Sequence, residues 1–151
     1  ANPDGYTLLL AFNGTLAVEN LNGEGKKRAV IDMTHAYPRG TVKRLTRTFT
    51  LNARTNRLTL EDAYTFSRQP RSLEEAFITF EQAAVAPNGR WVTIGPRGNR
   101  VRLSAVETPG RFRFKRLVEA SKEGRTDEVI TRITFAPRRL GKEMRLRFEV
   151  A

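Results

Sequence analysis

The stretch Val42–Phe66, VKRLTRTFTLNARTNRLTLEDAYTF, has the pattern of one long β-hairpin. β-Branched and aromatic residues dominate both arms, and apolar residues alternate with polar ones. Between the arms, Asn52–Arg57 is a polar loop suited to a turn. If Leu51 faces Leu58, antiparallel pairing brings alternate residues of the two arms opposite one another: Phe49 with Leu60, Arg47 with Asp62, and Leu45 with Tyr64.

One pair of opposite charges lies inside the apolar row of this hairpin. A charge on a core face is costly unless it is paired, so Arg47 and Asp62 are expected to form a mostly buried ion pair. A register slip of one residue would move both charges to the other face together with the apolar row. We interpret the pair as a structural ion pair that fixes register. The alternative is a pair poised in a functional site.

Short segments of strand character, separated by turn signals, continue along the rest of the chain. They are Tyr6–Phe12, Thr15–Glu19, Lys26–Thr34, Leu73–Gln82, Trp91–Ile94, Arg100–Glu107, Arg111–Ala120, Glu128–Phe135 and Met144–Val150, with a charged loop at Ser121–Asp127. About eleven short strands with such spacing are typical of an all-β sandwich or barrel. We expect an antiparallel β-sandwich.

The length and composition of the chain limit what it can be. With 151 residues, the chain is expected to form a single domain, residues 1–151, with a real core. There are no cysteines, so disulfides and thiolate metal sites are excluded. No run of eighteen apolar residues occurs, and we therefore expect no membrane span.

The net charge of +11 is unevenly placed along the sequence. From Ala86 onward there are 16 lysines and arginines against 7 acidic residues, a net charge of +9. Before Ala86 the count is 11 against 9, a net charge of +2. The basic second half favours an anionic partner, such as an acidic glycan. A solvated basic surface without a partner is the alternative.

The sequence offers little for catalysis or for metal binding. His35, in the segment DMTHAYP, is the single histidine, and zinc would need three or four ligands. We expect no metal and no cofactor. Glu61-Asp62 and Glu74-Glu75 are adjacent acidic pairs, and neighbours on a strand point to opposite faces. Glycosidase chemistry needs two facing carboxylates, so neither pair predicts a catalytic site. No catalytic residue is assigned.

Basic residues on strands provide the candidate binding residues. In the segment RFRFKR two phenylalanines alternate with basic residues, which predicts one apolar and one basic face. Arginines can bind sulfates or carboxylates by forked hydrogen bonds, or can blunt an exposed strand against aggregation. The candidate contacts to an anionic glycan are Arg111, Arg113, Lys115, Arg116, Arg145 and Arg147. Because the aromatics alternate into the core, no base-stacking platform and no nucleic-acid partner are expected.

Several segments together resemble a known family. These are Asp32–Pro38 (DMTHAYP), Arg47 in LTRTFTL, Asp62 in LTLEDAYTF, Thr79 in FITFEQ, and the segment NGTLAVENLNGEG. Over roughly residues 13–82 they resemble the C-terminal β-sheet domain of heparinase II/III-like polysaccharide lyases. Where this family often has a His before its Asn-Thr-Leu segment, this sequence has Phe12, and Gly14 is an extra residue before Thr15.

The resemblance implies a parent enzyme with an N-terminal α/α-toroid and a C-terminal antiparallel β-sandwich. It implies β-elimination on uronic-acid polysaccharides, in the periplasm or outside the cell. The catalytic Tyr, Asn and His of the family, and any zinc ligands, come from parts that do not map onto this chain. The chain is therefore expected to be a C-terminal fragment of a longer protein, inactive alone, whose partners are acidic polysaccharide and the toroid. A freestanding glycan-binding or adhesive module of a cell surface is the alternative.

Overall fold

The computed structural model describes residues 14–37, 40–118 and 128–151. These residues form eleven strands and one 3-10 helix: β1 (Thr15–Glu19), β2 (Lys26–Asp32), η1 (Thr34–Ala36), β3 (Val42–Asn52), β4 (Arg57–Phe66), β5 (Glu75–Thr79), β6 (Ala83–Val85), β7 (Trp91–Ile94), β8 (Val101–Val106), β9 (Gly110–Arg116), β10 (Thr131–Pro137) and β11 (Glu143–Val150). The expected strand at Tyr6–Phe12 and the expected loop Ser121–Asp127 lie outside the described residues. The fold is an all-β antiparallel sandwich, as the sequence pattern predicts.

The hairpin of β3 and β4 has the register that the alternation predicts. Leu51 pairs with Leu58, Phe49 with Leu60, Arg47 with Asp62 and Leu45 with Tyr64. In the turn, Asn56 has a left-handed backbone with a φ of 49°, a conformation that Asn tolerates better than most residues. The pairing is regular except for a shift between Val42 and Arg44. Side-chain pattern and turn composition therefore determine this hairpin together.

Other strands differ from the expected boundaries for local reasons. β2 ends at Asp32 because the Asp32 carboxylate accepts a hydrogen bond from the backbone N–H of Thr34, at 2.9 Å, where the chain turns into η1. The expected strand Leu73–Gln82 is shorter, Glu75–Thr79, and a separate strand β6 follows it. β6 has only three residues, so it carries too little alternation to be recognised in the sequence.

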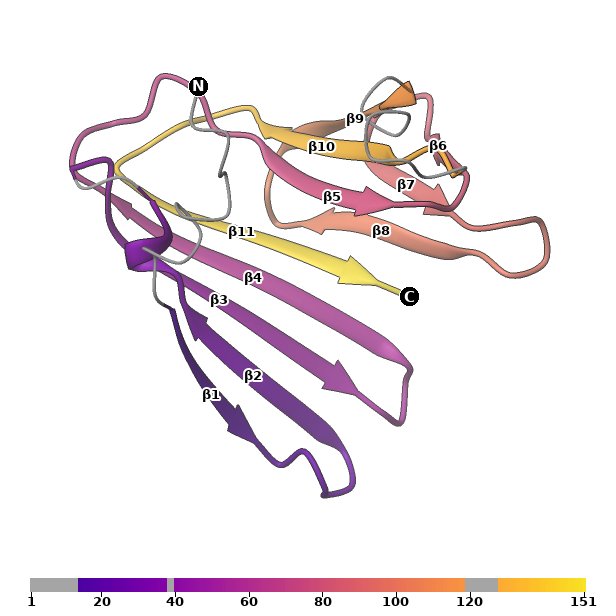
Figure 1. The fold of residues 1–151 in the computed structure, drawn as a ribbon, viewed down its shortest axis with the longest axis horizontal. Helices are drawn as coiled ribbons and strands as arrows, with labels where there is room; N and C mark the ends of the chain where they lie inside the picture. The colour runs from indigo at the N-terminus through magenta and orange to yellow at the C-terminus, as the bar shows by residue number, and fades with distance from the viewer. Residues whose placement is uncertain (1–13, 38–39, 119–127) are drawn as a thin grey trace. The chain divides into compact units, whose positions relative to one another are not determined.

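Figure 1 shows the strands in two sheets. Among the described residues the larger sheet has the order β1-β2-β3-β4-β11-β8-β7-β6, and the smaller sheet has the order β5-β10-β9. The chain divides into two compact units. Unit 1 comprises residues 1–70 and 141–147, and unit 2 comprises residues 71–140 and 148–151.

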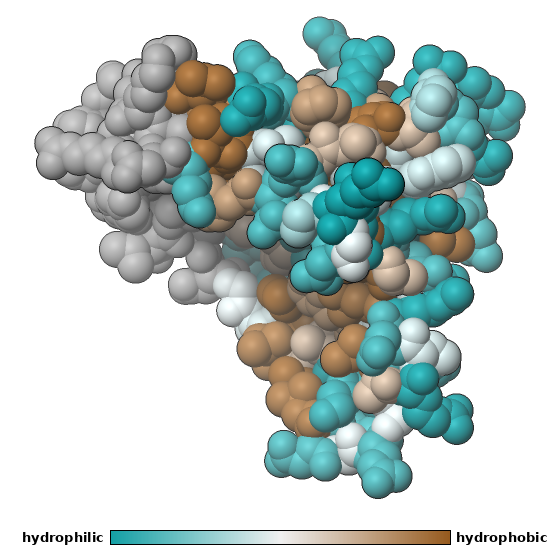
Figure 2. All heavy atoms as spheres, turned by 90° about the vertical axis from the view of Figure 1, so that its right-hand side faces the viewer, coloured by the Kyte–Doolittle hydropathy of each residue, from teal (hydrophilic) through white to brown (hydrophobic). Residues whose placement is uncertain are grey.

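Unit 1 is a sheet with one apolar and one polar face. Residues that pair directly share a face, so the apolar row of β3 and β4 continues onto β2 with Ala29 and Ile31 and onto β1 with Leu16 and Val18. Exposed apolar side chains appear in brown on the lower part of the molecule in Figure 2. The opposite face carries a run of threonines: Thr46, Thr48, Thr50, Thr59 and Thr65.

Unit 2 is a small sandwich held together by phenylalanines. Phe77, Phe112 and Phe135 come from the three strands of the smaller sheet. Phe148, on β11 of the larger sheet, packs edge-on against all three, with ring centroids 5.0, 6.1 and 5.2 Å away. Such edge-to-face arrangements are favourable for aromatic pairs. Phe112, Phe135 and Phe148 are each at most 2% exposed, so this cluster is the core of the sandwich.

No helix in the described residues is long and apolar enough to cross a membrane.

Candidate anion-binding site

Strand β9 carries a row of three cations on one face. Arg111, Arg113 and Lys115 alternate with Phe112 and Phe114, and all three basic side chains are exposed. Phe112 points into the core of unit 2, so the cations lie on the outward face of the smaller sheet. We call Arg111, Arg113 and Lys115 the β9 row. Their spacing along the strand is about 6.8 Å from one to the next.

The neighbours of the β9 row do not neutralise it. On the adjacent strand β10, Arg111, Arg113 and Lys115 face Ala136, Thr134 and Arg132, respectively. Arg132 is itself neutralised by Glu74, at 2.8 Å. Within the part of the chain that the structure describes, no side chain of the β9 row forms an ion pair. Because all three side chains are exposed, this row is accessible to a ligand.

The other three predicted glycan contacts lie elsewhere. Arg116 is at the end of β9 and has the parity of the core-facing residues, although it is exposed. Arg145 and Arg147 are on β11 in unit 1. There Arg145 lies 3.7 Å from the carboxylate of Glu61. The structure therefore brings together Arg111, Arg113 and Lys115 in one row, and it does not add the remaining three to that row.

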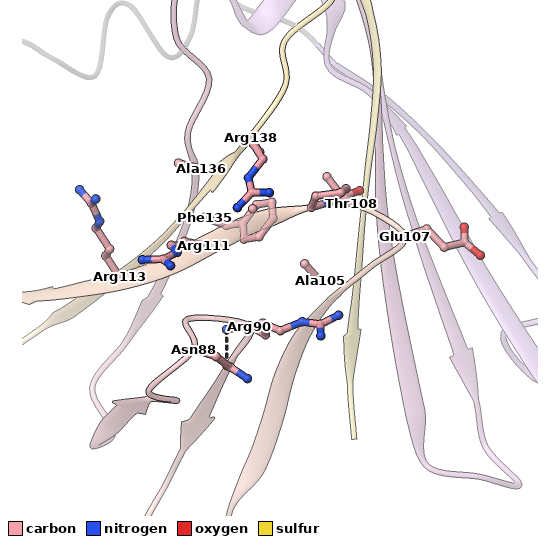
Figure 3. Close-up of a pocket in the computed structure, with 12 residues that line it drawn as sticks. Asn88, Arg90, Ala105, Glu107, Thr108, Arg111, Arg113, Phe135, Ala136 and Arg138 are labelled. Carbon is pink, nitrogen blue, oxygen red and sulfur yellow. Dashed lines mark hydrogen bonds between the residues drawn. The ribbon is translucent and has the colours of Figure 1, made fainter.

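One end of the β9 row opens into a hollow of about 700 Å³ in unit 2. The turn between β6 and β7, the turn between β8 and β9, and the end of β10 surround it. Four arginines line it: Arg90, Arg111, Arg113 and Arg138. Figure 3 shows Arg111 and Arg138 on the side of β9 and β10, and Arg90 on the side of the β6–β7 turn. We call this hollow the arginine pocket.

Backbone hydrogen bonds hold the arginine pocket together. The N–H of Phe112 donates to the carbonyl of Gly89 at 2.8 Å, which ties the β6–β7 turn to β9. The N–H of Arg138 donates to the carbonyl of Pro109 at 2.8 Å, which ties the end of β10 to the β8–β9 turn. The N–H of Arg90 donates to the Asn88 side chain at 3.0 Å and closes a local turn.

A single acidic residue, Glu107, is among the residues that line the arginine pocket. Its carboxylate points away from Arg90, Arg111 and Arg138 in Figure 3. None of these three guanidinium groups has an ion-pair partner in the described ranges. A guanidinium stays charged at any physiological pH and donates in a planar fork that matches carboxylate and sulfate oxygens. Chemically, the pocket can bind an anion.

Sequence reasoning missed Arg90 as a site residue and gave Arg138 no role. The turn signal Asn88-Gly89 is visible in the sequence, and Arg90 follows it directly. What the sequence does not show is that this turn lies against β9, because β6, on the other side of the turn, is too short to recognise. One signal could have identified Arg90: it is a basic residue directly after a turn, in the strongly basic second half of the sequence.

Arg47 and Asp62 form two parallel hydrogen bonds in unit 1. The Arg47 Nε and Nη2 atoms donate to the two Asp62 carboxylate oxygens at 2.8 and 2.7 Å. The Asp62 side chain is fully buried and that of Arg47 is 23% exposed. The pair lies within the apolar row of the hairpin and does not line the arginine pocket. Its geometry is that of a structural ion pair.

His35 is an exposed residue of the 3-10 helix η1 and is not part of an acidic cluster. In the described residues no three His, Cys, Asp or Glu side chains gather in a way that could hold a metal ion. Nearby, hydrogen bonds from the side chain and the backbone N–H of Thr34 lower the pKa of Asp32 below its usual value. Electrostatic interactions with Arg44 and His35 act in the same direction.

Comparison with known proteins adds no assignment. No protein-family model matches the sequence, and no curated protein is similar enough to count as a match.

Proposed function

We propose that this chain is a non-catalytic β-sandwich that binds acidic polysaccharide, and that it serves as the accessory C-terminal domain of a heparinase II/III-like lyase. The observation that carries the binding is the β9 row: three exposed cations on one strand face without an acidic partner in the described residues. The lyase assignment rests on the resemblance over roughly residues 13–82.

A repeating anion suits this surface better than a single small ion. Three charges spaced evenly along an extended strand can meet successive carboxylates or sulfates of one polymer chain. Each contact is exposed and therefore weak, so affinity depends on several contacts at once. Binding of this kind is sensitive to salt, because the screening length falls from about 10 Å at 0.1 M to about 3 Å at 1 M.

Catalysis is left to the rest of the proposed parent enzyme. β-Elimination requires a base to remove the proton beside the uronic carboxylate and a group to neutralise that carboxylate. The arginines supply the second requirement. Among the residues that line the arginine pocket, Glu107 is the single ordinary candidate for a base, and it points away from the arginines.

Two measurements on the purified chain test the proposal. The chain should elute from a heparin column at a higher salt concentration than a neutral protein of the same size. Absorbance of the unsaturated product should not rise when the chain is incubated with heparin, heparan sulfate or alginate. Elution at the salt of the neutral protein would refute the polysaccharide contact, and product formation would refute the accessory, non-catalytic role.

A further inference from the structure

The arginine pocket differs from the β9 row in being concave and fixed. Arg90, Arg111 and Arg138 come from three separate segments of unit 2, and backbone hydrogen bonds of 2.8 Å hold these segments to one another. Evenly spaced cations on an exposed strand can bind a repeating polymer in more than one position. Charges gathered around a hollow can instead hold one particular group, because the backbone segments that carry them are held in place before the ligand arrives.

Packing of the Arg111 side chain shows how one of these charges is positioned. Gly89 has a φ of 69°, and a Cβ placed there would lie 3.3 Å from Cγ and 3.4 Å from Cβ of Arg111. The aliphatic part of Arg111 therefore lies directly over the backbone of the β6–β7 turn. Contact along the stem reduces the rotamer freedom that Arg111 would otherwise lose on binding a ligand.

The wall between the arginines is apolar. Ala105, Pro109, Phe135 and Ala136 line the hollow together with the bare backbone of Gly110. Phe135 is 1% exposed, so it contributes only a small part of its ring to the surface. Asn88 and Thr108 add polar side chains at the edge. A charged rim around an apolar wall fits a ligand with one acidic group on a compact ring.

We propose that the arginine pocket binds a single acidic sugar unit, with its carboxylate or sulfate held by Arg90, Arg111 and Arg138 and its ring against Pro109 and Ala105. This inference rests on the proposed binding of acidic polysaccharide, and it adds a defined subsite to that function. Carboxylate and sulfate share the chemistry that guanidinium groups recognise, so the choice between them is left to the experiment.

The test is titration calorimetry with small ligands on the whole chain. The probes are a sulfated heparin disaccharide, an unsulfated hyaluronan disaccharide with one carboxylate, and neutral cellobiose. We expect saturable one-to-one binding of at least one acidic disaccharide and none of cellobiose. Binding of the unsulfated hyaluronan disaccharide would show that the subsite accepts a carboxylate. Binding of the sulfated heparin disaccharide alone would show that the subsite requires a sulfate. Equal binding of cellobiose, or no binding of either acidic disaccharide, would overturn the proposal.

Matched variants separate the pocket from general charge. Arg90→Gln and Arg138→Gln should each weaken disaccharide binding by at least about tenfold, because each removes a charge-assisted contact. Arg97→Gln and Arg100→Gln make the same change in net charge at exposed residues of unit 2 that do not line the pocket. These controls should leave the affinity within about twofold. Equal losses in pocket and control variants would show that only net charge matters and would overturn the subsite.

Failure of the subsite and failure of the proposed function give different results. If heparin retains the chain while acidic disaccharides do not bind, the polysaccharide function stands and the pocket proposal is wrong. If heparin does not retain the chain either, the function itself is wrong. Thermal unfolding of each variant, compared with the unmodified chain, shows whether a loss of binding comes from a loss of folding.

Discussion

At the residue scale, the Arg47–Asp62 pair is the part of the structure for which sequence reasoning was most specific. Its register follows from the alternation of the two arms together with the turn that brings Leu51 opposite Leu58. The sequence also predicts that the pair is mostly buried, but it does not predict the hydrogen-bond geometry or which of the two side chains is more exposed. In the structure the Asp62 side chain is fully buried and that of Arg47 is 23% exposed.

Asp62→Asn should lower the free energy of unfolding by about 3–5 kcal/mol, because it leaves the guanidinium of Arg47 without its buried counter-ion. The neighbouring Glu61→Gln is the control. Glu61 faces the other side of the sheet, where the side chain of Arg145 lies 3.7 Å away and is 70% exposed. Because this ion pair is exposed, Glu61→Gln should change the free energy of unfolding by less than about 1 kcal/mol. Urea unfolding of the three proteins measures both effects. Equal small losses would contradict a structural role for the pair.

Asp32 should make the stability of the chain depend on pH. Its folded-state pKa is lowered by the hydrogen bonds from Thr34, so its contribution is fully present above the unfolded pKa and is lost as pH falls through the folded pKa. Asp32→Ala should therefore be less stable than the unmodified chain at pH 6. The difference should shrink below about pH 4, the usual range of an aspartate. A difference that stays constant from pH 6 to pH 3 would contradict this origin.

At the element scale, strands with a regular alternation were predictable and short strands were not. β1 and β7 have the boundaries that the sequence indicates, whereas β6, with three residues, was not predicted. The same limit applies to the arginine pocket. Its arginines are brought together by backbone hydrogen bonds between segments that are distant in sequence, and residue patterns do not encode such pairings locally.

Gly110, at the start of β9, is predicted to be sensitive to any side chain. A Cβ there would collide with the Phe135 ring and with the carbonyl oxygen of Ala136, so Gly110→Ala should destabilise the chain by about 1–3 kcal/mol. Gly141→Ala is the control, since a Cβ at Gly141 would lie 3.4 Å from its nearest neighbour, the Glu143 carbonyl oxygen. Thermal unfolding compares the two. A Gly110→Ala variant as stable as Gly141→Ala would contradict the close packing of β9 on β10.

At the scale of the whole molecule, the uneven charge of the sequence predicts an anionic partner for the second half, but it does not identify the residues that could contact this partner. The net charge of +9 after Ala86 favoured an anionic partner. The structure divides the basic residues by environment: Arg145 lies near Glu61, Arg132 pairs with Glu74, and the β9 row has no acidic partner in the described segments. Net charge cannot make this distinction, because it does not record which cations are neutralised.

Heparin retention of matched triple variants tests the polysaccharide-binding role of the β9 row most directly. One variant replaces the β9 row with glutamines: Arg111→Gln, Arg113→Gln and Lys115→Gln. The other makes the same charge change at exposed residues of unit 1: Lys26→Gln, Lys43→Gln and Arg54→Gln. If the β9 row binds acidic polysaccharide, its variant should elute at clearly lower salt than the unit 1 variant, which should elute close to the unmodified chain. Elution of both variants at the same salt would contradict the account.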